Sequence, residues 1–482
     1  MRDFVDRIKN LYGIRAGRTC NRGRVSLFVV SAVLSFLSCA ADKTGWDRVP
    51  DILRRMEAPA FPGKDFVITR YGARGDSATD CTEAFRSAVD LCHAAGGGRV
   101  VVPSGTYLTG PIRLKSNVNL HLSEGAVVSF FADPRRLLPV VLTRYEGNPC
   151  YNFSPLVLAY RQRNLAVTGK GRLVGNGNAA VWEDMNSKKK ADSDTLRAMG
   201  ERGTPVEKRI FGDGHFLRPS MIEPMECENI LIEGITVEQG PMWVIHPVLC
   251  RNVAVRNVTV RSNGPNNDGC DPESCRDVLI ENCAFFTRDD GIAVKSGRNA
   301  DGRRIGVPSE NIVIRYCRFE AVPESRNGMA VGSEVSGGVR NVFVERCTMN
   351  GRNQGIYIKS NRARGGIVEQ VYFRDITING VRECALAVSM HYGRERGDCP
   401  PVFRDIQFRD IRCDRGNRPI LVVGQMESPV RDALFEDCAF QNMTRPMEVE
   451  NAANLVMKNV RINNEQISRV INTPATLPMG DP

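Results

Sequence analysis

Two stretches of nine residues, "NIVIRYCRF" (residues 311–319) and "NVFVERCTM" (residues 341–349), follow the same pattern. Each opens with a polar residue, alternates side chains with the period of a short strand, breaks at a polar pair, and resumes as a second short strand. Seven further stretches repeat the pattern and begin at Asn229, Asn252, Asp277, Gln370, Asp405, Asp432 and Asn454. Their starts lie roughly 22 to 35 residues apart, and repeats of this length indicate a solenoid.

The segments between these stretches show no helical periodicity, so consecutive strands must stack in parallel, coil upon coil. This arrangement is a right-handed parallel β-helix, an all-β fold. A leucine-rich repeat would need leucine-dominated signatures and a helical segment in each turn, and the stretches have neither. The segment from Glu183 to Phe216 is rich in Lys, Asp and Gly and is expected to leave the coils, as loops that wall a binding groove often do.

One helix is predicted before the coils, in "TDCTEAFRSAVDLCHAAGGG" (residues 79–98). Asp80 and Glu83 have the spacing of a capping box, and the glycines from Gly96 onward end the helix. An apolar stripe on one face consists of Ala84, Phe85, Ala88, Leu91, Cys92 and Ala95. We expect this helix to cover the N-terminal end of the solenoid, because an open coil would expose apolar core and strand edges to water.

The chain contains 16 cysteines. Cys283, Cys317, Cys347 and Cys438 recur at one position of the repeat, and residues at one position of successive coils stack inside a solenoid. We therefore interpret them as buried free thiols and not as disulfides. No pair of cysteines has the CxxC spacing of a metal site.

The N-terminus has the pattern of an export signal. The apolar run "VSLFVVSAVLSFL" (residues 25–37) follows Arg15, Arg18, Arg22 and Arg24 and is too short to span a bilayer. We expect residues 1–40 to be a signal peptide, with cleavage after Ala40 or, as in bacterial lipoproteins, lipid attachment at Cys39. Residues 41–63 are then a linker and residues 64–482 a single domain, located in the periplasm, anchored at the outer membrane or secreted.

The composition is that of a soluble globular protein, with 42% hydrophobic, 25% charged and 7% aromatic residues. A net charge of +10 implies only a mild attraction to polyanions. No basic stripe with interleaved aromatic residues is present, which argues against nucleic acid as a partner. We expect a monomer without a cofactor.

Acidic residues are placed one coil apart in the middle of the repeats. "TRDDGIAVKSG" (residues 287–297) sets Asp289 and Asp290 side by side, and "GPNNDGCDPESC" (residues 264–275) supplies Asp268 and Asp271 about one coil earlier. Because parallel strands lie roughly 4.8 Å apart, residues one coil apart lie one above the other. Adjacent carboxylates resist burial, so this convergence indicates a site on the surface. Asn327 and Lys359, on the next two coils, extend the site into a stripe.

Converging carboxylates are typical of two enzyme chemistries. Glycoside hydrolysis needs one protonated carboxyl group that donates to the leaving oxygen and one carboxylate that activates water. Mutual repulsion between the carboxylates would keep a proton on the first. The other chemistry is elimination from a uronate at a Ca²⁺ site, which would also require an arginine base nearby.

Taken in order, the motifs resemble those of the polygalacturonase family, glycoside hydrolase family 28, over most of the mature chain. The similar segments are "YGARGDSATDCTEAF", "GGGRVVVPSGTYLTG", "NNDGCDP", "RDDGIAVKSG", "GMAVGSE" and "YIKS". The resemblance implies that Asp289 is the general acid, that Asp268 and Asp290 hold and activate water, and that the anomeric carbon is inverted. It also implies that Lys359 neutralises a substrate carboxylate and that Tyr392 in "MHYG" lines the sugar site.

The chain departs from the family pattern at two positions. Asn327 stands where the family has a histidine, and Tyr357 stands where it has an arginine. These changes put ordinary endo-cleavage of homogalacturonan in doubt, and rhamnogalacturonan-type members also lack that histidine. Arg362 or Arg364 could supply the missing cation, although we favour the interpretation of both as surface arginines.

The sequence therefore predicts an exported hydrolase that cleaves α-linked galacturonic acid residues in a pectic poly- or oligosaccharide, at a branched or terminal linkage in preference to plain homogalacturonan. The predicted catalytic residues are Asp289, Asp268 and Asp290, and the predicted substrate-binding residues are Lys359, Asn327, Tyr357 and Tyr392, with no metal ligand. Three alternatives are a rhamnogalacturonan hydrolase of the same family, a Ca²⁺-dependent pectate lyase and a non-catalytic glycan-binding β-helix.

Overall fold

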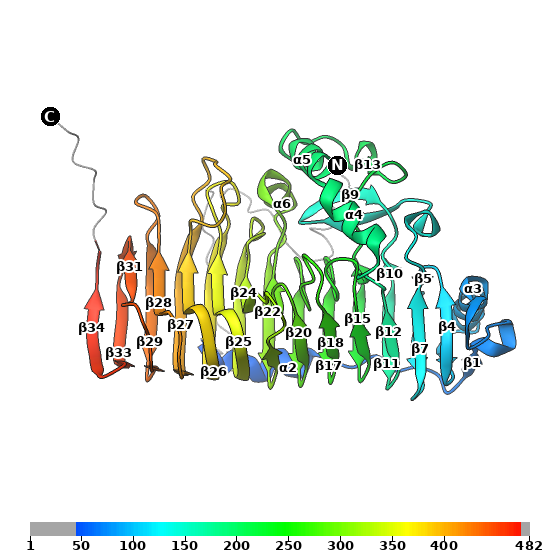
Figure 1. Cartoon of the computed structure of the whole chain (residues 1–482), viewed down its shortest axis with the longest axis horizontal. Coiled ribbons are helices and arrows are strands. Elements are labelled where there is room, and N and C mark those ends of the chain that lie inside the picture. Colours follow the sequence, from blue (N-terminus) through cyan, green and yellow to red (C-terminus); the bar gives the residue numbers. More distant parts are fainter. Residues whose placement is uncertain (1–44, 474–482) are drawn as a thin grey trace, which may run out of the picture.

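The computed structural model of the protein describes residues 45–473. The predicted signal peptide, the cleavage position after Ala40 and the lipidation position at Cys39 lie outside the described residues. From residue 65 onward the chain winds through successive coils whose strands pair in parallel and form three faces along the length of the molecule (Figure 1). The predicted right-handed parallel β-helix is confirmed.

Each face contains strands from many coils. The first face consists of β1 (Asp65–Val67), β3 (Gly98–Val102), β6 (Val118–Leu122), β11 (Arg163–Gly169), β15 (Glu228–Glu233), β17 (Arg251–Arg256), β19 (Arg276–Glu281), β22 (Ser309–Arg315), the first parts of β25 (Val339–Lys359), β26 (Ile367–Ser389) and β27 (Val402–Cys413), then β29 (Val430–Glu436) and β33 (Leu455–Ile462). The second consists of β2 (Asp76–Asp80), β4 (Gly105–Thr109), β7 (Ala126–Phe130), β12 (Arg172–Val174), β16 (Thr236–Glu238), β18 (Thr259–Ser262), β20 (Ala284–Thr287), β23 (Arg318–Glu320), later parts of β25 to β27, and β30 (Ala439–Phe440). The third consists of β5 (Ile112–Arg113), β10 (Val157–Tyr160), β14 (Ile222–Met225), β21 (Ile292–Val294), β24 (Asn327–Val331), the ends of β25 and β26, β28 (Arg418–Val423) and β31 (Glu448–Glu450).

The polar residue that opens each repeat occupies a left-handed turn. All nine opening residues, from Asn229 to Asn454, have φ between 51° and 57°. Asn and Asp tolerate this conformation better than other residues with a side chain, which explains their recurrence. Their side chains also form a ladder between coils, in which Asn252 Nδ2 donates to Asn229 Oδ1 at 2.8 Å and Asn311 Nδ2 donates to Asp277 Oδ1 at 3.1 Å. The opening residue therefore sets both the turn and the register.

The interior is filled by like residues stacked on like. The rings of Phe373, Phe408 and Phe435 stack at centroid distances of 5.0 and 4.9 Å. The predicted buried thiols are confirmed, since Cys317 and Cys347, like the other two members of that series, are free and buried. Stacked aromatic rings of equal shape fill a uniform coil without voids.

Both ends of the solenoid are covered. Helix α3 (Thr82–Ala94) packs against β1 and β3 at the N-terminal end, as predicted. The assignment of Leu91 to the apolar stripe is wrong, because its side chain is 50% exposed. The buried face of the helix consists of Ala84, Phe85, Ala88, Val89 and Cys92. At the other end β34 (Glu465–Ile471) pairs antiparallel with β33 and ends the series of parallel strands.

Part of the predicted linker is packed against the coils. A 3₁₀ helix, η1 (Gly45–Arg48), and helix α2 (Val49–Arg55) lie along the first face, where Val49 and Ile52 are buried against Val313 and neighbouring side chains. Arg55 forms an ion pair of 2.6 Å with Asp277. The expectation of a linker therefore does not hold for residues 45–55, because apolar side chains on the outer surface of the coils provide a docking surface.

Further helices stand on the solenoid near its middle (Figure 1). Helix α5 (Lys190–Glu201) lies within the segment expected to leave the coils, and helix α4 (Ala180–Lys188) begins three residues before that segment. Helix α6 (Asn299–Ile305) follows β21. The remaining strands are β8 (Val141–Tyr145), β9 (Asn148–Asn152), β13 (Ile210–Phe211) and β32 (Ala452–Ala453), and the other 3₁₀ helices are η2 (Ile68–Tyr71), η3 (Pro134–Leu137) and η4 (Val206–Lys208). No helix within residues 45–473 is long and apolar enough to cross a membrane.

Candidate active site

Three of the predicted site residues occupy one position of three successive coils. On the third face Cys270 pairs with Ile292, and Ile292 pairs with Met329 on the next coil. Asp268, Asp290 and Asn327 each lie two residues before one of these paired residues, so they occupy equivalent positions. The backbone confirms the stacking, because Gly269 N donates to Asp290 O at 2.9 Å and Gly291 N donates to Asn327 O at 3.1 Å. The predicted convergence of carboxylates is thus a consequence of the coil repeat.

The three predicted catalytic carboxylates form one cluster. Asp268, Asp289 and Asp290 each place an oxygen within 4.8 Å of the others. They line a cavity of about 280 Å³, which is also lined by Arg197 of α5 and by Arg298, the residue before α6. Asp268 and Asp290 are 4% and 1% exposed, whereas Asp289 keeps more of its carboxylate open to the cavity. Asp289 is therefore the group best placed to reach a bound molecule.

Asp290 is held in its ionised form. Its Oδ2 forms an ion pair of 2.8 Å with Lys359 Nζ, and its Oδ1 accepts a hydrogen bond of 2.6 Å from Asn327 Nδ2. Burial alone would raise the pKa of Asp290, but the charges of Lys359 and Lys295 and these hydrogen bonds outweigh burial and lower it. An ionised carboxylate beside a general acid is suited to activate water.

A lysine that the sequence analysis did not assign lies between the carboxylates. Lys295 Nζ is 3.3 Å from Asp268, 3.5 Å from Asp271 and 3.5 Å from Glu334, and it is 4.4 Å from the centre of the Trp243 ring. Burial raises the pKa of Asp268 to about 7, against the opposing charge of Lys295 and with the help of Asp289 and Asp290. The charge of Lys295 therefore limits the rise of the Asp268 pKa, so that part of Asp268 is ionised near neutral pH.

Asp289 has the environment of a general acid. Burial, and then the charge of Asp290, raises the pKa of its carboxyl group above the ordinary value. The nearest cation is Arg326, whose Nε is 3.8 Å away on a largely exposed side chain. Neighbouring carboxylates with pKa values pushed in opposite directions are the usual arrangement of an acid and a base in one site. The doublet thus supplies one group of each kind.

A buried arginine fixes the backbone around the doublet. The Arg352 guanidinium is fully buried and donates to the carbonyl oxygens of Thr287 at 2.7 Å and Asn327 at 2.8 Å, and also to that of Asp289. These bonds join two adjacent coils at the point where the side chains predicted to be catalytic leave the backbone. No sequence motif marked Arg352, because its role depends on backbone oxygens of distant residues.

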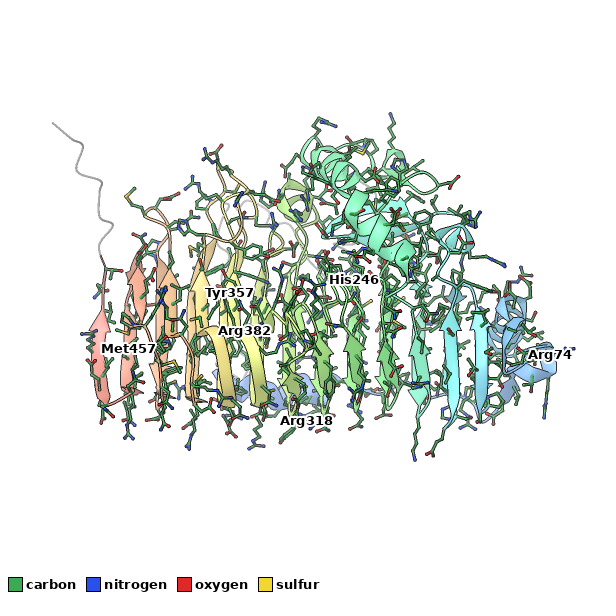
Figure 2. All side chains as sticks on the ribbon, viewed as in Figure 1. Arg74, His246, Arg318, Tyr357, Arg382 and Met457 are labelled. Carbon is green, nitrogen blue, oxygen red and sulfur yellow. The ribbon has the colours of Figure 1, made fainter. Side chains whose placement is uncertain are left out.

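A second buried group supports the wall of the cavity from behind. His246 lies between Glu223 and Glu273, and its Nε2 is 2.9 Å from Glu273 Oε2. Burial opposes its charge, but the two carboxylates raise the pKa of His246 to about 9. The His246 ring meets the Trp243 ring edge-on at 4.8 Å. His246 is labelled in Figure 2, beneath the helices. Through this ring contact His246 supports Trp243, whose ring is covered by Lys295.

The predicted aromatic residues lie at one edge of the site. Tyr392 lines the cavity, and its ring meets that of Tyr357 at a centroid distance of 6.1 Å. Lys359 Nζ lies 5.0 Å from the centre of the Tyr392 ring and 5.5 Å from that of Tyr357, which is labelled in Figure 2. Tyr357 therefore flanks the lysine and is not among the side chains that line the cavity.

The two arginines of "RARGG" have different positions. Arg364 is 3% exposed, lines the cavity and forms ion pairs with Glu334 at 3.3 Å and with Glu395. The expectation of a surface residue is therefore wrong for Arg364, because the loop that follows β25 turns its side chain inward. Arg362 is partly exposed and pairs with Glu427.

A continuous series of ion pairs walls the cavity. Glu146, between β8 and β9, binds Arg197 of α5 at 2.7 Å and Arg298, which precedes α6, at 3.0 Å. Arg298 and Arg364 both bind Glu395, in the loop between β26 and β27. The series thus links loops from coils far apart in the sequence and fixes the shape of the cavity.

The same carboxylate cluster is the set within residues 45–473 that could hold a cation. Two ammonium groups already contact it, Lys359 at Asp290 and Lys295 at Asp268. These lysines supply the positive charge that a Ca²⁺ ion would otherwise bring, and Ca²⁺ prefers six to eight oxygen ligands. The geometry therefore favours carboxylate chemistry without a metal.

Comparisons with known proteins agree with this chemistry. A family model described as glycosyl hydrolases family 28 matches residues 213–457, more than half of the chain, and one described as rhamnogalacturonase A/epimerase, pectate lyase-like, matches residues 66–121. A hyperthermoactive exopolygalacturonase from Thermotoga maritima is 39% identical, with a TM-score of 0.87 over 90% of this chain and 99% of that one. A probable polygalacturonase of Vitis vinifera is 27% identical over 80% of this chain and 76% of its own. An endo-polygalacturonase of Pectobacterium carotovorum is 23% identical over 87% and 92%. The chain belongs to glycosyl hydrolases family 28 and is a glycoside hydrolase.

Proposed function

We propose that this protein is an inverting hydrolase that removes galacturonic acid residues from the end of a pectic galacturonan chain. The observation that carries the proposal is the cluster of Asp268, Asp289 and Asp290 inside a small cavity walled by cationic side chains. The similarity to the exopolygalacturonase of Thermotoga maritima supports a uronate substrate and action at a chain end. Export of the protein, which we also propose, agrees with a polymeric substrate.

The proposed reaction uses the acid and the base of the doublet. Asp289 donates its proton to the glycosidic oxygen as the bond from that oxygen to the anomeric carbon breaks. A water between Asp268 and Asp290 gives a proton to one of these carboxylates while its oxygen forms the new bond to the anomeric carbon. The proton gained by the base then leaves to solvent and Asp289 is protonated again, so the site returns to its starting state.

Cationic groups at the cavity would favour binding of a uronate over binding of a neutral sugar. Lys359 faces the cavity beside Asp290, and Arg326 lies largely exposed at its rim. A substrate carboxylate bound near these groups would gain charge-assisted hydrogen bonds. Tyr392 adds an aromatic face against which the apolar side of a sugar ring can pack.

The walls of the cavity support action at a chain end. Helices α4 and α5 stand over the coils (Figure 1). Arg197 of α5 lines the cavity, and the ion pairs from Glu146 to Glu395 form part of its wall. Lys189, at the junction of the two helices, also binds Asn266 at 2.6 Å, close to the catalytic Asp268. A volume of about 280 Å³ is close to the lower end of the range for small-molecule sites, so the cavity suits a short terminal segment.

The short distance between the carboxylates favours a second mechanism that must be tested. Retaining glycosidases hold their two carboxyl groups about 5–5.5 Å apart, and inverting ones hold them about 6.5–9.5 Å apart. Oxygens of the three aspartates lie within 4.8 Å, which would permit direct attack by a carboxylate. We favour inversion because two carboxylates, Asp268 and Asp290, are available to share one water.

The test is to incubate the purified protein with oligogalacturonates and polygalacturonate and to follow the products by NMR. We expect release of the monomer, with the anomeric form opposite to that of the linkage cleaved, and no activity from Asp289→Asn. Asp90→Asn, which alters an exposed partner of Lys115 on α3, is the matched control and should retain full activity. Random fragments would refute terminal action, a product of retained configuration would refute inversion, and unsaturated uronates lost on chelation would establish a lyase.

A further inference from the structure

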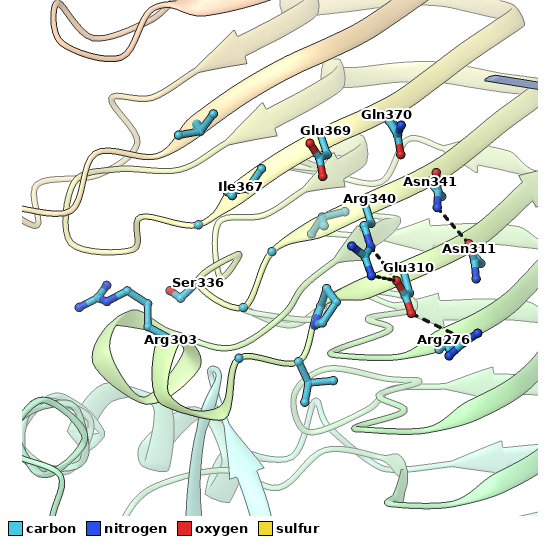
Figure 3. Close-up of a pocket in the computed structure, with 18 of the residues that line it drawn as sticks. Arg276, Arg303, Glu310, Asn311, Ser336, Arg340, Asn341, Ile367, Glu369 and Gln370 are labelled. Carbon is cyan, nitrogen blue, oxygen red and sulfur yellow. Dashed lines mark hydrogen bonds and ion pairs between the residues drawn. The ribbon is translucent and has the colours of Figure 1, made fainter. Parts of the chain in front are cut away.

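A second cavity, larger than the catalytic one, lies on the outer side of the solenoid (Figure 3). We call it the arginine groove and define it by Arg276, Arg303, Glu310, Ser336, Arg340 and Ile367. Its volume is about 1000 Å³, at the upper end of the range for ligand sites. It follows the turns that precede β22, β25, β26 and β27 and is bounded by the C-terminal end of α6.

One arginine of the groove has no carboxylate partner among the described residues. The lining includes Arg276, Arg303 and Arg340 together with the carboxylates of Glu310 and Glu369. Arg276 forms ion pairs with Asp277 at 3.5 Å and with Glu310 at 3.6 Å, and Arg340 forms one with Glu310 at 2.6 Å. Arg303 donates only to the backbone oxygens of Ala363 and Arg364, at 2.8 and 2.9 Å, among the residues that the structure describes. Its charge is therefore compensated by no carboxylate, which favours an anionic ligand.

A buried hydroxyl group in the groove lacks a hydrogen-bond partner. Ser336 is 5% exposed, and its Oγ accepts or donates no hydrogen bond within residues 45–473. Its Cβ lies next to Gly302, the residue before Arg303, and Figure 3 shows both labelled side chains at the same end of the groove. A buried unpaired hydroxyl is costly unless a ligand or water satisfies it. The pair of Ser336 and Arg303 therefore has the chemistry of a carboxylate site.

The rest of the groove is suited to sugar rings. Gly306, Gly338 and Gly366 are among its lining residues and present backbone, without a side chain, at these positions. Ile367 is 44% exposed and offers an apolar surface beside the charged groups. An acidic sugar combines an apolar ring face with hydroxyls and a carboxylate, so it matches each of these features.

The groove and the catalytic cavity share a wall. Ser336 N donates to Gly297 O at 3.0 Å, and Gly337 N donates to Ser296 O at 2.8 Å, in the turn that follows β21, the strand directly after Asp289 and Asp290. Arg303 in the groove holds the carbonyl oxygen of Arg364, whose side chain lines the catalytic cavity. A molecule bound in the groove would thus lie one turn of chain away from the active site.

We propose that the arginine groove binds a second segment of acidic polysaccharide, a short uronate oligosaccharide, outside the active site. The proposal rests on the proposed function for the identity of the uronate. Binding there would hold the polymer beside the catalytic cavity and raise the effective concentration of chain ends. Its expected consequence is tighter binding of long substrates than of short ones.

The test counts binding sites in the catalytically inactive variant. Asp289→Asn is titrated calorimetrically with tetragalacturonate, and we expect two sites per chain. Adding Ile367→Glu places a negative charge in the groove and should weaken the second site at least about tenfold, equivalent to about 1.4 kcal/mol. Adding Val470→Glu, a matched change at a 57% exposed position on β34, should leave both sites intact.

A smaller change tests the hydroxyl. Ser336→Ala removes only the unpaired oxygen and should weaken the second site by about 2- to 12-fold, the range for one hydrogen bond. A single site in Asp289→Asn, or two unchanged sites in the variant with Ile367→Glu, would overturn the proposal. Hydrolysis of oligogalacturonates by the wild type is measured separately, so failure of the proposed function shows as absence of product, and failure of the groove shows as activity with one binding site.

Discussion

Replacement of Lys295 by Met is the most informative perturbation of the site. Methionine is similar in length but carries no charge, so the change removes the ammonium group that contacts Asp268, Asp271 and Glu334. Among the described residues, no other lysine or arginine forms an ion pair with Asp268 or Asp271. Two buried carboxylates thereby lose their only salt-bridge partner.

The magnitude follows from the distance between the charges. At 3.3 Å and an effective dielectric constant of about 20, the attraction between Lys295 and Asp268 is on the order of 5 kcal/mol, an upper bound. Measured effects of one such neighbour correspond to about 1 to 3 pH units. The pKa of Asp268, about 7 in the wild type, should rise by that amount in Lys295→Met. The ionised fraction of Asp268 at pH 6 would then fall about 10- to 1000-fold.

The assay is the pH dependence of kcat/KM on an oligogalacturonate. A raised pKa means that Asp268 ionises only at higher pH, so the acidic limb of the profile should shift toward higher pH. Lys458→Met removes a lysine that pairs with Glu436 on a distant coil and should leave the profile unchanged. A uniform loss of activity with the limb in place would refute the reasoning, because it would show a structural role without an effect on ionisation.

The linkage between protonation and folding gives an independent check of the same variant. Without Lys295, the pKa values of Asp268 and Asp271, already raised by burial, rise further above their unfolded values. The folded variant then binds more protons than the unfolded chain, so its stability should fall as the pH rises toward and above neutrality. The Tm difference from the wild type should accordingly be smaller at pH 5 than at pH 8.

Three further predictions concern other parts of the structure. Asn327→Asp replaces the donor to Asp290 by a second carboxylate and should raise the pKa of Asp290, so activity on oligogalacturonate at acidic pH should fall about 10- to 100-fold and recover partly at higher pH; a loss independent of pH would contradict this. Phe408→Ala removes the middle ring of the stack between Phe373 and Phe435 and should cost about 3–5 kcal/mol in urea unfolding; a cost below about 1 kcal/mol would mean that the stack does not support the fold. Among cysteines in residues 45–473, Cys399 alone is not fully buried and should react first with a thiol reagent in the native protein; rapid reaction of several would disprove the buried thiol series.

The fold was predictable because every coil of a solenoid has the same geometry, so the same sequence pattern recurs once per coil. The opening residue of each repeat needs a left-handed turn, and the series from Asn229 to Asn454 supplies Asn, Asp or Gln at every one of these positions. The helices α2 and α4 were not predicted, because each buries few apolar residues against an outer surface that has no sequence period. A segment stabilised by contacts with distant coils carries no local signal.

The site was predictable only where its residues share a position in the repeat. Asp268, Asp290 and Asn327 stack in register, so their spacing in the sequence gave their spacing in space. Lys295 stands in the same stretch as the doublet, but its contacts with Asp271 and Glu334 depend on how the chain turns after β21. Side chains that meet across loops, as Arg298 and Glu395 do, have no fixed separation that a repeat could reveal.

The charges at the centre of the third face are not required by the repeat itself. Lys359 is in register with Ser389, and Ser389 is in register with Val423, so later coils place a small polar and then an apolar residue at the position that holds a buried ammonium group here. Burying ionised groups is costly, and well-packed apolar side chains of similar volume are often neutral or more stabilising. The fold thus tolerates uncharged residues at this position. We expect the buried pair of Lys359 and Asp290 to stabilise the fold less than well-packed apolar side chains would at the same positions. Carboxylates held at different pKa values in a small cavity are what acid and base catalysis needs, so the charge placement is explained by the chemistry of the site and not by the architecture around it.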